Sequence, residues 1–421
     1  MSAPEMISMG CRLNIAESEN LRQNLAANQI DGANLIIVNS CAVTNEAVRQ
    51  TRQAIRRAKK AHPDKNIIVT GCAAQVDPAM FADMPETSAV VGNFDKYEAA
   101  NFKLGAQSNR PDIRVSDIMR VTETAPHMVS AFAERARAFV EIQNGCDHRC
   151  TFCIIPYGRG NSRSVPAGVV VDQVRALVDK GFQEVVLTGV DVTSYGPDLP
   201  GEPTLGLLIE RILHHVPGLR RLRLSSLDGI EIDERMAELL TGEQRVMPHV
   251  HLSLQSGDNM ILKRMKRRHN REQAIALVER LKSRRPDIAI GADIIAGFPT
   301  EDEAMFANSL AVIEQCDIVH GHIFPYSPKR GTPAANMPQV DGQVIRERAR
   351  ILRTAIERRA ASWRKSLIGS KQNMLVELSG NGGYSENFAR IRLDRSSAAG
   401  QIVPVEITGV DDQQLTGKVA A

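Results

Sequence analysis

Three cysteines in the middle of the chain have a spacing that suits an iron–sulfur cluster. Cys146, Cys150 and Cys153 form a C-x3-C-x2-C pattern directly after a predicted strand. A loop this short can place three thiolates around one cluster, whereas ordinary four-iron clusters take four cysteine ligands. Three cysteines therefore leave one iron open to a small molecule, and a molecule bound there can receive an electron directly.

A structural zinc ion is the alternative for this loop. His148 lies between the first two cysteines and would complete a set of four ligands. Zinc sites more often use two separate C-x2-C arms than a single loop, so the pattern favours the cluster. With a cluster, His148 is expected to be an exposed loop residue.

A second set of three cysteines is spread over the N-terminal region. Cys11, Cys41 and Cys72 each follow a predicted strand, at intervals of about thirty residues that match one βαβ period. Because the carboxyl ends of parallel strands share one edge of a sheet, these cysteines are expected to converge. The alternative is three unrelated core residues, since a lone cysteine is usually a small buried hydrophobe. Cys316, at a predicted helix end, is interpreted that way.

The predicted elements that position these cysteines alternate between strands and helices. In the first hundred residues, helices are predicted at 17–28 and 44–62 and strands at 5–10, 33–39, 66–70 and 88–92. Residues 137–330 repeat the pattern, with strands at 138–143, 184–188, 219–225, 249–254, 288–295 and 318–324. Helices fall between them at 166–180, 204–216, 271–284 and 301–315. This order predicts a parallel sheet with right-handed crossovers, followed by a (βα)6 partial barrel.

The remaining segments separate and end these domains. Residues 104–135 lack periodicity and carry Pro, Gly, Asn and Ser, which predicts a linker. Residues 342–368 form a predicted Arg-rich helix, and short β-like runs after it predict a small five-stranded barrel. The expected fold class is α/β. It comprises a flavodoxin-like N-terminal domain at 1–103, the partial barrel with its trailing helix at 136–368, and an all-β barrel at 369–421.

The composition limits the classes of function. The chain has 421 residues, of which 43% are hydrophobic, and a formal net charge of +3. With so small a charge, any nucleic-acid contact must come from local basic patches. The longest apolar runs have the length of strands, and the N-terminus lacks a basic segment followed by an apolar core. We therefore expect a cytoplasmic protein with no membrane span.

Several motifs together point to one family. The run GCDHRCTFC at 145–153 resembles the cluster loop of the radical S-adenosylmethionine (AdoMet) superfamily. Two three-cysteine sets in this order, followed by a small β-module, resemble the methylthiotransferase family from about residue 5 to residue 419. GYSENF at 383–388 looks like the entry motif of that family's TRAM RNA-binding module. The resemblance implies two 4Fe–4S clusters, one on each set of cysteines, with AdoMet bound to the open iron of the second set along the chain.

Four further segments match the family in order. VVLTGVDVTSYG at 185–196, LSLQSG at 252–257 and ADIIAGFPTE at 292–301 resemble the strand motifs around AdoMet, and FPYSPKRGTPAA at 324–335 resembles the end of the core. Each alone would be an ordinary strand followed by a Gly/Pro turn, but four in family order are specific. The AdoMet contacts that this implies are Phe152, Gly189, Asp191, Ser225, Gln255, Ile294 and Gly297.

Two N-terminal motifs indicate the substrate. MGCRLN at 9–14 and NSCAVTNEAVRQTRQ at 39–53 resemble the branch that acts on N6-threonylcarbamoyladenosine (t6A) of tRNA. This implies a methylthio group added to C2 of t6A at position 37, through a 5′-deoxyadenosyl radical and sulfur donated at the auxiliary cluster. Alternatives within the family are N6-isopentenyladenosine and an aspartate of a ribosomal protein. A zinc-dependent RNA-binding protein without catalysis is the alternative outside it. We expect a monomer that takes electrons from a flavodoxin-type donor.

Basic patches fit an RNA partner. A single patch is more often a solvated helix face than a phosphate contact. Here three patches, at 49–60, 263–271 and 346–365, accompany an RNA-type module. We therefore expect tRNA rather than DNA, with the target adenosine in a single-stranded anticodon loop. The residues expected to contact RNA are Arg56, Lys263, Arg267, Arg268, Arg353 and Arg358.

Overall fold

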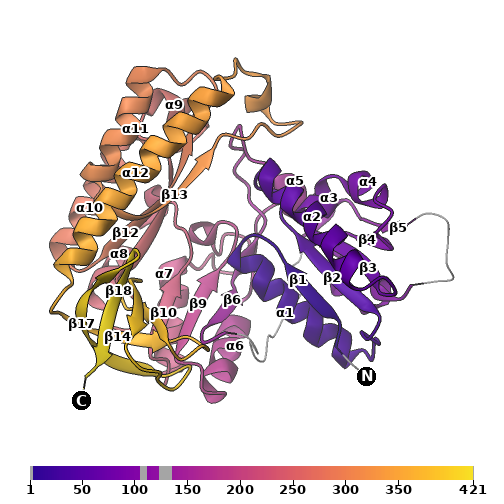
Figure 1. Cartoon of the computed structure of the whole chain (residues 1–421), viewed down its shortest axis with the longest axis horizontal. Coiled ribbons are helices and arrows are strands. Elements are labelled where there is room, and N and C mark those ends of the chain that lie inside the picture. Colours follow the sequence, from indigo (N-terminus) through magenta and orange to yellow (C-terminus); the bar gives the residue numbers. More distant parts are fainter. Residues whose placement is uncertain (1–2, 105–110, 123–134, 421) are drawn as a thin grey trace.

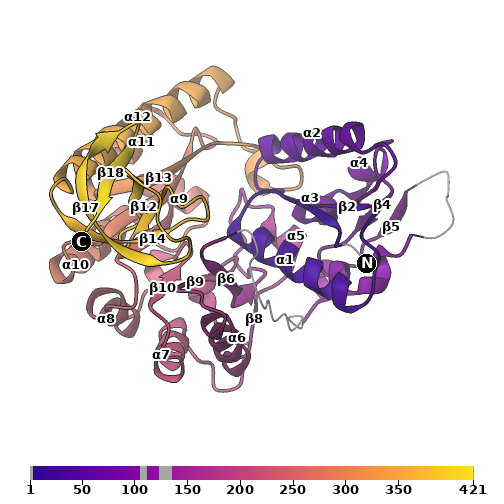
Figure 2. The same cartoon turned by 60° about the horizontal axis from the view of Figure 1, so that its bottom comes forward.

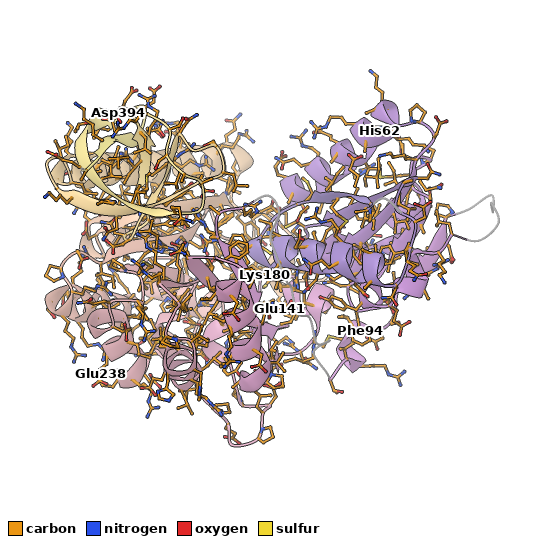
Figure 3. The ribbon with its side chains drawn as sticks, turned by 90° about the horizontal axis from the view of Figure 1, so that it is seen from below. His62, Phe94, Glu141, Lys180, Glu238 and Asp394 are labelled. Carbon is orange, nitrogen blue, oxygen red and sulfur yellow. The ribbon has the colours of Figure 1, made fainter. Side chains whose placement is uncertain are left out.

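The computed structural model describes residues 3–104, 111–122 and 135–420. A central α/β core carries the N-terminal domain on one side and the small C-terminal barrel on another (Figure 1). Seen from below, the barrel and the N-terminal domain flank the core, and Glu141 lies where the N-terminal domain and the core meet (Figure 3). No helix in these ranges has both the length and the apolar character needed to cross a membrane.

The N-terminal domain is a five-stranded parallel sheet covered on both faces. Its strands, in order across the sheet, are β1 (Glu5–Ser8), β2 (Leu35–Ser40), β3 (Asn66–Gly71), β4 (Ala89–Val91) and β5 (Asp112–Arg114). One face packs on α1 (Arg12–Ala27), and the other on α2 (Asn45–Ala61) and α4 (Pro78–Ala82), as Figure 2 shows. The short helix α3 (Cys72–Val76) directly follows β3.

The strand order corrects the flavodoxin-like expectation. A flavodoxin-like sheet places its first strand between two others, in the order 2-1-3-4-5. Here β1 lies at the edge, has four residues and leaves both of its end residues exposed. Such a strand suits an edge, because an interior parallel strand is buried on both faces. β5, which pairs with β4, lies within the predicted linker. Residues 105–110 and 123–134 of that linker are outside the described residues.

The core is an arc of six parallel strands, as predicted. One sheet has the order β10 (Arg221–Leu224), β9 (Glu184–Thr188), β6 (Ala138–Glu141), and the other β11 (His249–Gln255), β12 (Ala289–Ala296), β13 (Ile318–Pro325). Two isolated bridges, Leu222–Val246 and Leu227–Leu252, connect the sheets. Helices pack against the strands through one continuous hydrophobic core. They are α6 (Ala167–Asp179), α7 (Leu205–His215), α8 (Glu234–Gly242), α10 (Arg271–Arg284), α11 (Glu303–Gln315) and α12 (Gly342–Ser366).

The C-terminal region is a closed five-stranded barrel, which confirms the predicted all-β module. Its order is β14 (Lys371–Val376), β15 (Gly382–Ser385), β16 (Arg390–Leu393), β18 (Gln414–Val419), β17 (Ile402–Asp411). Trp363 and Leu367, at the end of α12, pack against its hydrophobic interior. The long basic helix therefore joins the barrel to the core through apolar contacts.

A buried charge cluster fixes this barrel to the amino ends of the core strands. Glu184 is fully buried and forms ion pairs with Arg223 (3.1 Å), Arg221 (3.5 Å) and Arg137 (3.6 Å). Arg223 also donates to the carbonyl oxygens of Ser385 and Glu386 in the barrel, at 3.2 and 3.1 Å. Burial would raise the pKa of Glu184, but the guanidinium groups outweigh it and lower that pKa to about 2.

We expect Glu184→Gln to lower the free energy of unfolding by about 3–5 kcal/mol at neutral pH, because it leaves buried guanidinium groups without their carboxylate. Glu210→Gln, at a half-exposed pair with Arg235, is the matched control and should cost less than about 1 kcal/mol. The pKa of Glu184 is depressed in the folded state. The contribution of Glu184 to the free energy of unfolding is therefore complete above its ordinary pKa of 4.5 and is lost as the pH falls toward about 2. Urea unfolding at several pH values tests this, and equal costs for the two variants would contradict it.

Candidate active site

The loop of Cys146, Cys150 and Cys153 lies at the carboxyl end of the first core strand. It begins after β7 (Gln143–Asn144) and ends at the short helix α5 (Ile155–Arg159). Backbone contacts fix it at both ends: the Cys146 amide donates to Gly160 O at 3.1 Å, and the Thr151 amide to Met265 O at 3.1 Å. The loop is therefore held in place by the fold itself.

The three thiols fit an iron–sulfur cluster better than a zinc ion. Burial raises the pKa of Cys146, with a further rise from Asp191, and burial raises that of Cys153 to about 12. Thiolates at these positions therefore need a bound cation. At the usual zinc–sulfur bond length of about 2.3 Å, a tetrahedral zinc ion would hold its sulfur ligands about 3.8 Å from one another. In the described chain, no three cysteine sulfurs lie within 4.8 Å of one another, whereas a larger inorganic cluster separates its ligands further.

His148 is not the exposed loop residue that the sequence suggested. Its side chain is 24% exposed, and its Nε2 lies 2.9 Å from Oδ2 of Asp191. The same carboxylate oxygen is 3.9 Å from Sγ of Cys146. Because His148 is paired with a carboxylate, it is not placed as a fourth ligand beside the three cysteines.

The predicted AdoMet contacts gather at the carboxyl ends of the core strands, with one exception. Gly189 follows β9, and a Cβ there would lie 2.7 Å from Gln143 O, so glycine is required. Ser225 follows β10, and its buried hydroxyl has no hydrogen-bond partner in the described chain, as expected of a group that binds a ligand. Gln255, the last residue of β11, and Gly297, the first residue after β12, both have positive φ angles, of 68° and 71°.

Ile294 is the exception. It is fully buried in the hydrophobic core between strands and helices, on the face away from the cluster loop. Its neighbour Ile295 packs with Phe152 and Phe298 beside the loop. Alternate residues of a strand face opposite sides, so Ile295 and not Ile294 faces the cluster loop.

Arg267 and Arg268, expected to contact RNA, lie instead beside the cluster loop. Arg267 is 8% exposed, with Nη1 3.7 Å from Sγ of Cys150 and Nη2 2.9 Å from Asp228. Arg268 is 42% exposed and pairs with Glu231 at 2.8 Å and with Asp228 at 3.4 Å.

The other four predicted RNA contacts remain on helical surfaces. Arg56 on α2 is 54% exposed, and Arg358 on α12 is 75% exposed and pairs with Glu314. Lys263 is exposed on α9 (Asn259–Arg264). Arg353 on α12 is partly engaged, since it donates to Ile323 O at 3.1 Å.

The second set of cysteines lies at one edge of the N-terminal sheet. Cys11, Cys41 and Cys72 follow β1, β2 and β3; the first is exposed and the other two are buried. Gly10 makes room for this arrangement, because a Cβ there would lie 2.7 Å from Sγ of Cys41. Burial raises the pKa of Cys41 to about 12, and Cys72 and Cys11 contribute to the rise. A bound cation is therefore required here too for three thiolates.

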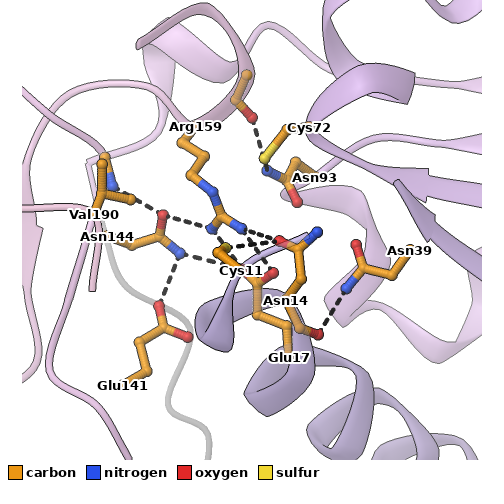
Figure 4. A network of polar contacts seen from close by, with 12 residues as sticks. Cys11, Asn14, Glu17, Asn39, Cys72, Asn93, Glu141, Asn144, Arg159 and Val190 are labelled. Carbon is orange, nitrogen blue, oxygen red and sulfur yellow. Dashed lines mark hydrogen bonds and ion pairs between the residues drawn. The ribbon is translucent and has the colours of Figure 1, made fainter. Parts of the chain in front are cut away.

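Helix α5 connects the two cysteine sites, and Figure 4 shows its last residue, Arg159, in a polar network that includes Cys11 and Asn14. It begins two residues after Cys153, and a Cβ on its Gly158 would lie 3.3 Å from Cβ of Cys72. Asn93 donates to Gly158 O at 2.7 Å and lies 3.6 Å from Sγ of Cys72. The loop of the first site therefore continues into a helix that packs against the second site.

A buried polar network extends this connection. Arg159 donates to Glu17 and to Asn14, both at 2.7 Å, and Oδ1 of Asn14 also accepts from the Cys11 thiol at 3.7 Å. Lys96 pairs with Glu17 at 2.9 Å. Burial would raise the pKa of Glu17, but Arg159 and Lys96 hold it well below its usual range. No sequence signal indicated this network, because Glu17 and Arg159 are 142 residues apart.

Comparisons with known proteins agree with this geometry. Residues 140–313 match the radical SAM superfamily, and residues 5–92 match the uncharacterized protein family UPF0004. The chain is 51% identical to the threonylcarbamoyladenosine tRNA methylthiotransferase MtaB of Rickettsia prowazekii, over 97% of this chain and 95% of that one. It is 32% identical, over the full length of both, to a tRNA-2-methylthio-N(6)-dimethylallyladenosine synthase of Roseobacter denitrificans. The radical AdoMet methyltransferase TsrM of Kitasatospora setae shares the fold, with a TM-score of 0.54, 16% identity and coverage of 75% and 68%.

Proposed function

Because the chain belongs to the radical AdoMet methylthiotransferase family, we propose that it adds a methylthio group to C2 of t6A in tRNA. The observation that carries this proposal is the pair of three-cysteine sites joined by α5. Identity of 51% to a threonylcarbamoyladenosine methylthiotransferase, against 32% to a dimethylallyladenosine synthase, supports the t6A branch.

The two cysteine sites have separate roles in this proposal. Cys146, Cys150 and Cys153 would hold a 4Fe–4S cluster with an iron open to AdoMet, and Cys11, Cys41 and Cys72 would hold an auxiliary 4Fe–4S cluster. When bound, the clusters and AdoMet supply the electron, the radical, the sulfur and the methyl group. Side chains could not replace them, because the hydrogen on C2 of adenine is not acidic enough to be removed by a general base at neutral pH.

The residues of the chain hold and orient these groups. Ser225 and Asp191, at the carboxyl ends of adjacent strands, are proposed to hold the polar end of AdoMet. Arg159 and Lys96 place buried positive charge beside the auxiliary site, which offsets the charge of several thiolates.

The surroundings of the site suit a tRNA substrate. The exposed basic residues on α2, α9 and α12 are proposed to bind phosphates of the anticodon arm, with the closed barrel as a second RNA-binding surface. The enzyme is proposed to act as a monomer in the cytoplasm, with electrons from a flavodoxin-type protein.

Deletion of the gene tests the proposal. Mass spectrometry of tRNA nucleosides should show that 2-methylthio-t6A disappears and that t6A accumulates. A plasmid copy should restore the modified nucleoside, and a copy with Cys150→Ala should not. Loss of the isopentenyl counterpart instead would move the chain to that branch. Unchanged tRNA would overturn the proposal and direct attention to a ribosomal protein.

A further inference from the structure

A group of polar side chains lines the inner face of the second core sheet, away from the helices. Val250, Leu252, Ile290 and Ala292 belong to the hydrophobic core that faces the helices. Because alternate residues of a strand point to opposite sides, the residues between them face the concave interior of the partial barrel. These interior residues of β11, β12 and β13 are His249, His251, Asp293, His320 and His322.

Three of these side chains form a compact unit, which we call the lumen triad: His251, Asp293 and His322. Oδ1 of Asp293 lies 3.0 Å from Nε2 of His251 and 3.0 Å from Nδ1 of His322. The two imidazole rings are 4.7 Å apart. Gly291 admits the first ring, because a Cβ at that position would lie 2.3 Å from Nδ1 of His251.

The lumen triad lies one layer below the cluster loop. Ser253 and Ile295 follow His251 and Asp293 by two residues on the same faces, a rise of about 7 Å toward the carboxyl ends. The carbonyl of Ser253 accepts from Arg267, whose other nitrogen is 3.7 Å from Sγ of Cys150. Ile295 packs with Phe152 of the cluster loop. A substrate group that extends from the cluster loop into this interior would therefore reach the triad.

The triad is open on one side only. His251 is 8% exposed and Asp293 20%, whereas the side chain of His322 is 64% exposed. Nδ1 of His322 is engaged by Asp293, so Nε2 is the ring nitrogen left to meet a ligand on this exposed side chain. Burial would raise the pKa of Asp293, but its hydrogen bonds with His251 and His322 lower that pKa to about 2. The carboxylate therefore fixes the orientation of the His322 ring through Nδ1.

We propose that the lumen triad binds the threonylcarbamoyl substituent of the substrate adenosine, with His322 as the donor to its carboxylate. This rests on the proposed function. The substituent ends in the carboxylate and hydroxyl of threonine, whereas an isopentenyl substituent is a hydrocarbon. A hydrocarbon placed here would cover Nε2 of His322 without offering it a polar partner, and such a mismatch rejects a substrate strongly. The triad therefore selects t6A over substrates with an apolar substituent.

The test compares two anticodon stem-loop RNAs that differ only in t6A or unmodified adenosine at the target position. Their dissociation constants for the reconstituted protein are measured by fluorescence anisotropy. The wild-type protein should prefer the t6A RNA, and His322→Leu should reduce that preference by about 10- to 100-fold, as for loss of a charge-assisted hydrogen bond. His322→Gln keeps an amide donor and should retain part of the preference. His215→Leu, at an exposed histidine of α7, is the matched control.

Two results would overturn the inference. One is an unchanged t6A preference in His322→Leu. The other concerns binding of a divalent cation, measured with Zn²⁺ alone. In this result the wild-type protein binds Zn²⁺ and His322→Leu does not, while His322→Leu keeps the t6A preference. That result would assign the triad to a metal. If the wild-type protein converts t6A RNA but His322→Leu keeps the t6A preference, only the role of the triad is contradicted and the proposed function stands. A wild-type protein that does not convert t6A RNA contradicts the proposed function.

Discussion

Cys150→Ala is expected to reduce the cleavage of AdoMet to 5′-deoxyadenosine to background. Cys150 is one of three cysteines in the loop that would hold the open cluster, and the described chain has no fourth cysteine there. Loss of a cluster ligand should reduce the rate of AdoMet cleavage by more than the roughly 10- to 100-fold that is typical when a residue that only supports a ligand is lost. The iron content of the reconstituted protein should fall by about four atoms per chain. Liquid chromatography of the 5′-deoxyadenosine formed with dithionite measures the effect.

Cys316→Ala is the matched control for this variant. Cys316 is fully buried at the end of α11, in the hydrophobic core and outside both three-cysteine sites. Its substitution should leave iron content and AdoMet cleavage intact. If Cys150→Ala still formed 5′-deoxyadenosine at the wild-type rate, the radical cluster would not be at this loop.

Cys72→Ala is expected to separate the two halves of the reaction. The auxiliary site loses a ligand, so transfer of the methylthio group should fall to background. The cluster loop keeps all three of its cysteines, so cleavage of AdoMet should continue. Both products are measured in one reaction with t6A RNA, by mass spectrometry of the nucleosides and of 5′-deoxyadenosine. Cys72 also contacts α5, and Gly158→Ala therefore serves as a second variant that disturbs this contact but keeps all the cysteines.

A methylthio product from Cys72→Ala at the wild-type rate would contradict the assignment of the auxiliary cluster. Loss of both products in Cys72→Ala, with AdoMet cleavage retained in Gly158→Ala, would indicate that the two clusters depend on each other. In that case the separation of roles would be wrong, although both cysteine sets would still be required.

Local sequence patterns were sufficient to predict most of the core strands and to place the cysteines relative to the strands. The strands are short apolar runs with clear ends, and Cys41 and Cys72 come directly after two of them. The order of the N-terminal strands was wrong because pairing depends on burial of whole strands. The four residues of β1 do not reveal in sequence that they belong at an edge.

Side-chain direction and long-range pairing account for the other differences. Ile294 was chosen as an AdoMet contact, but its strand turns Ile295 toward the loop instead. Arg267 sits in a basic run whose composition suggested solvent exposure. The chain turns at Lys266, with a φ of 59°, and Arg267 points inward. The lumen triad combines residues from three strands, and only their pairing in the sheet brings them together.

The most direct test of the central claim is a reaction of the purified, reconstituted protein with AdoMet, dithionite and a t6A-containing anticodon stem-loop. Mass spectrometry of the digested RNA should show 2-methylthio-t6A, with 5′-deoxyadenosine formed alongside it. A matched stem-loop with N6-isopentenyladenosine should give little product. Efficient conversion of the isopentenyl RNA and none of the t6A RNA, by a protein that contains both clusters, would contradict the account.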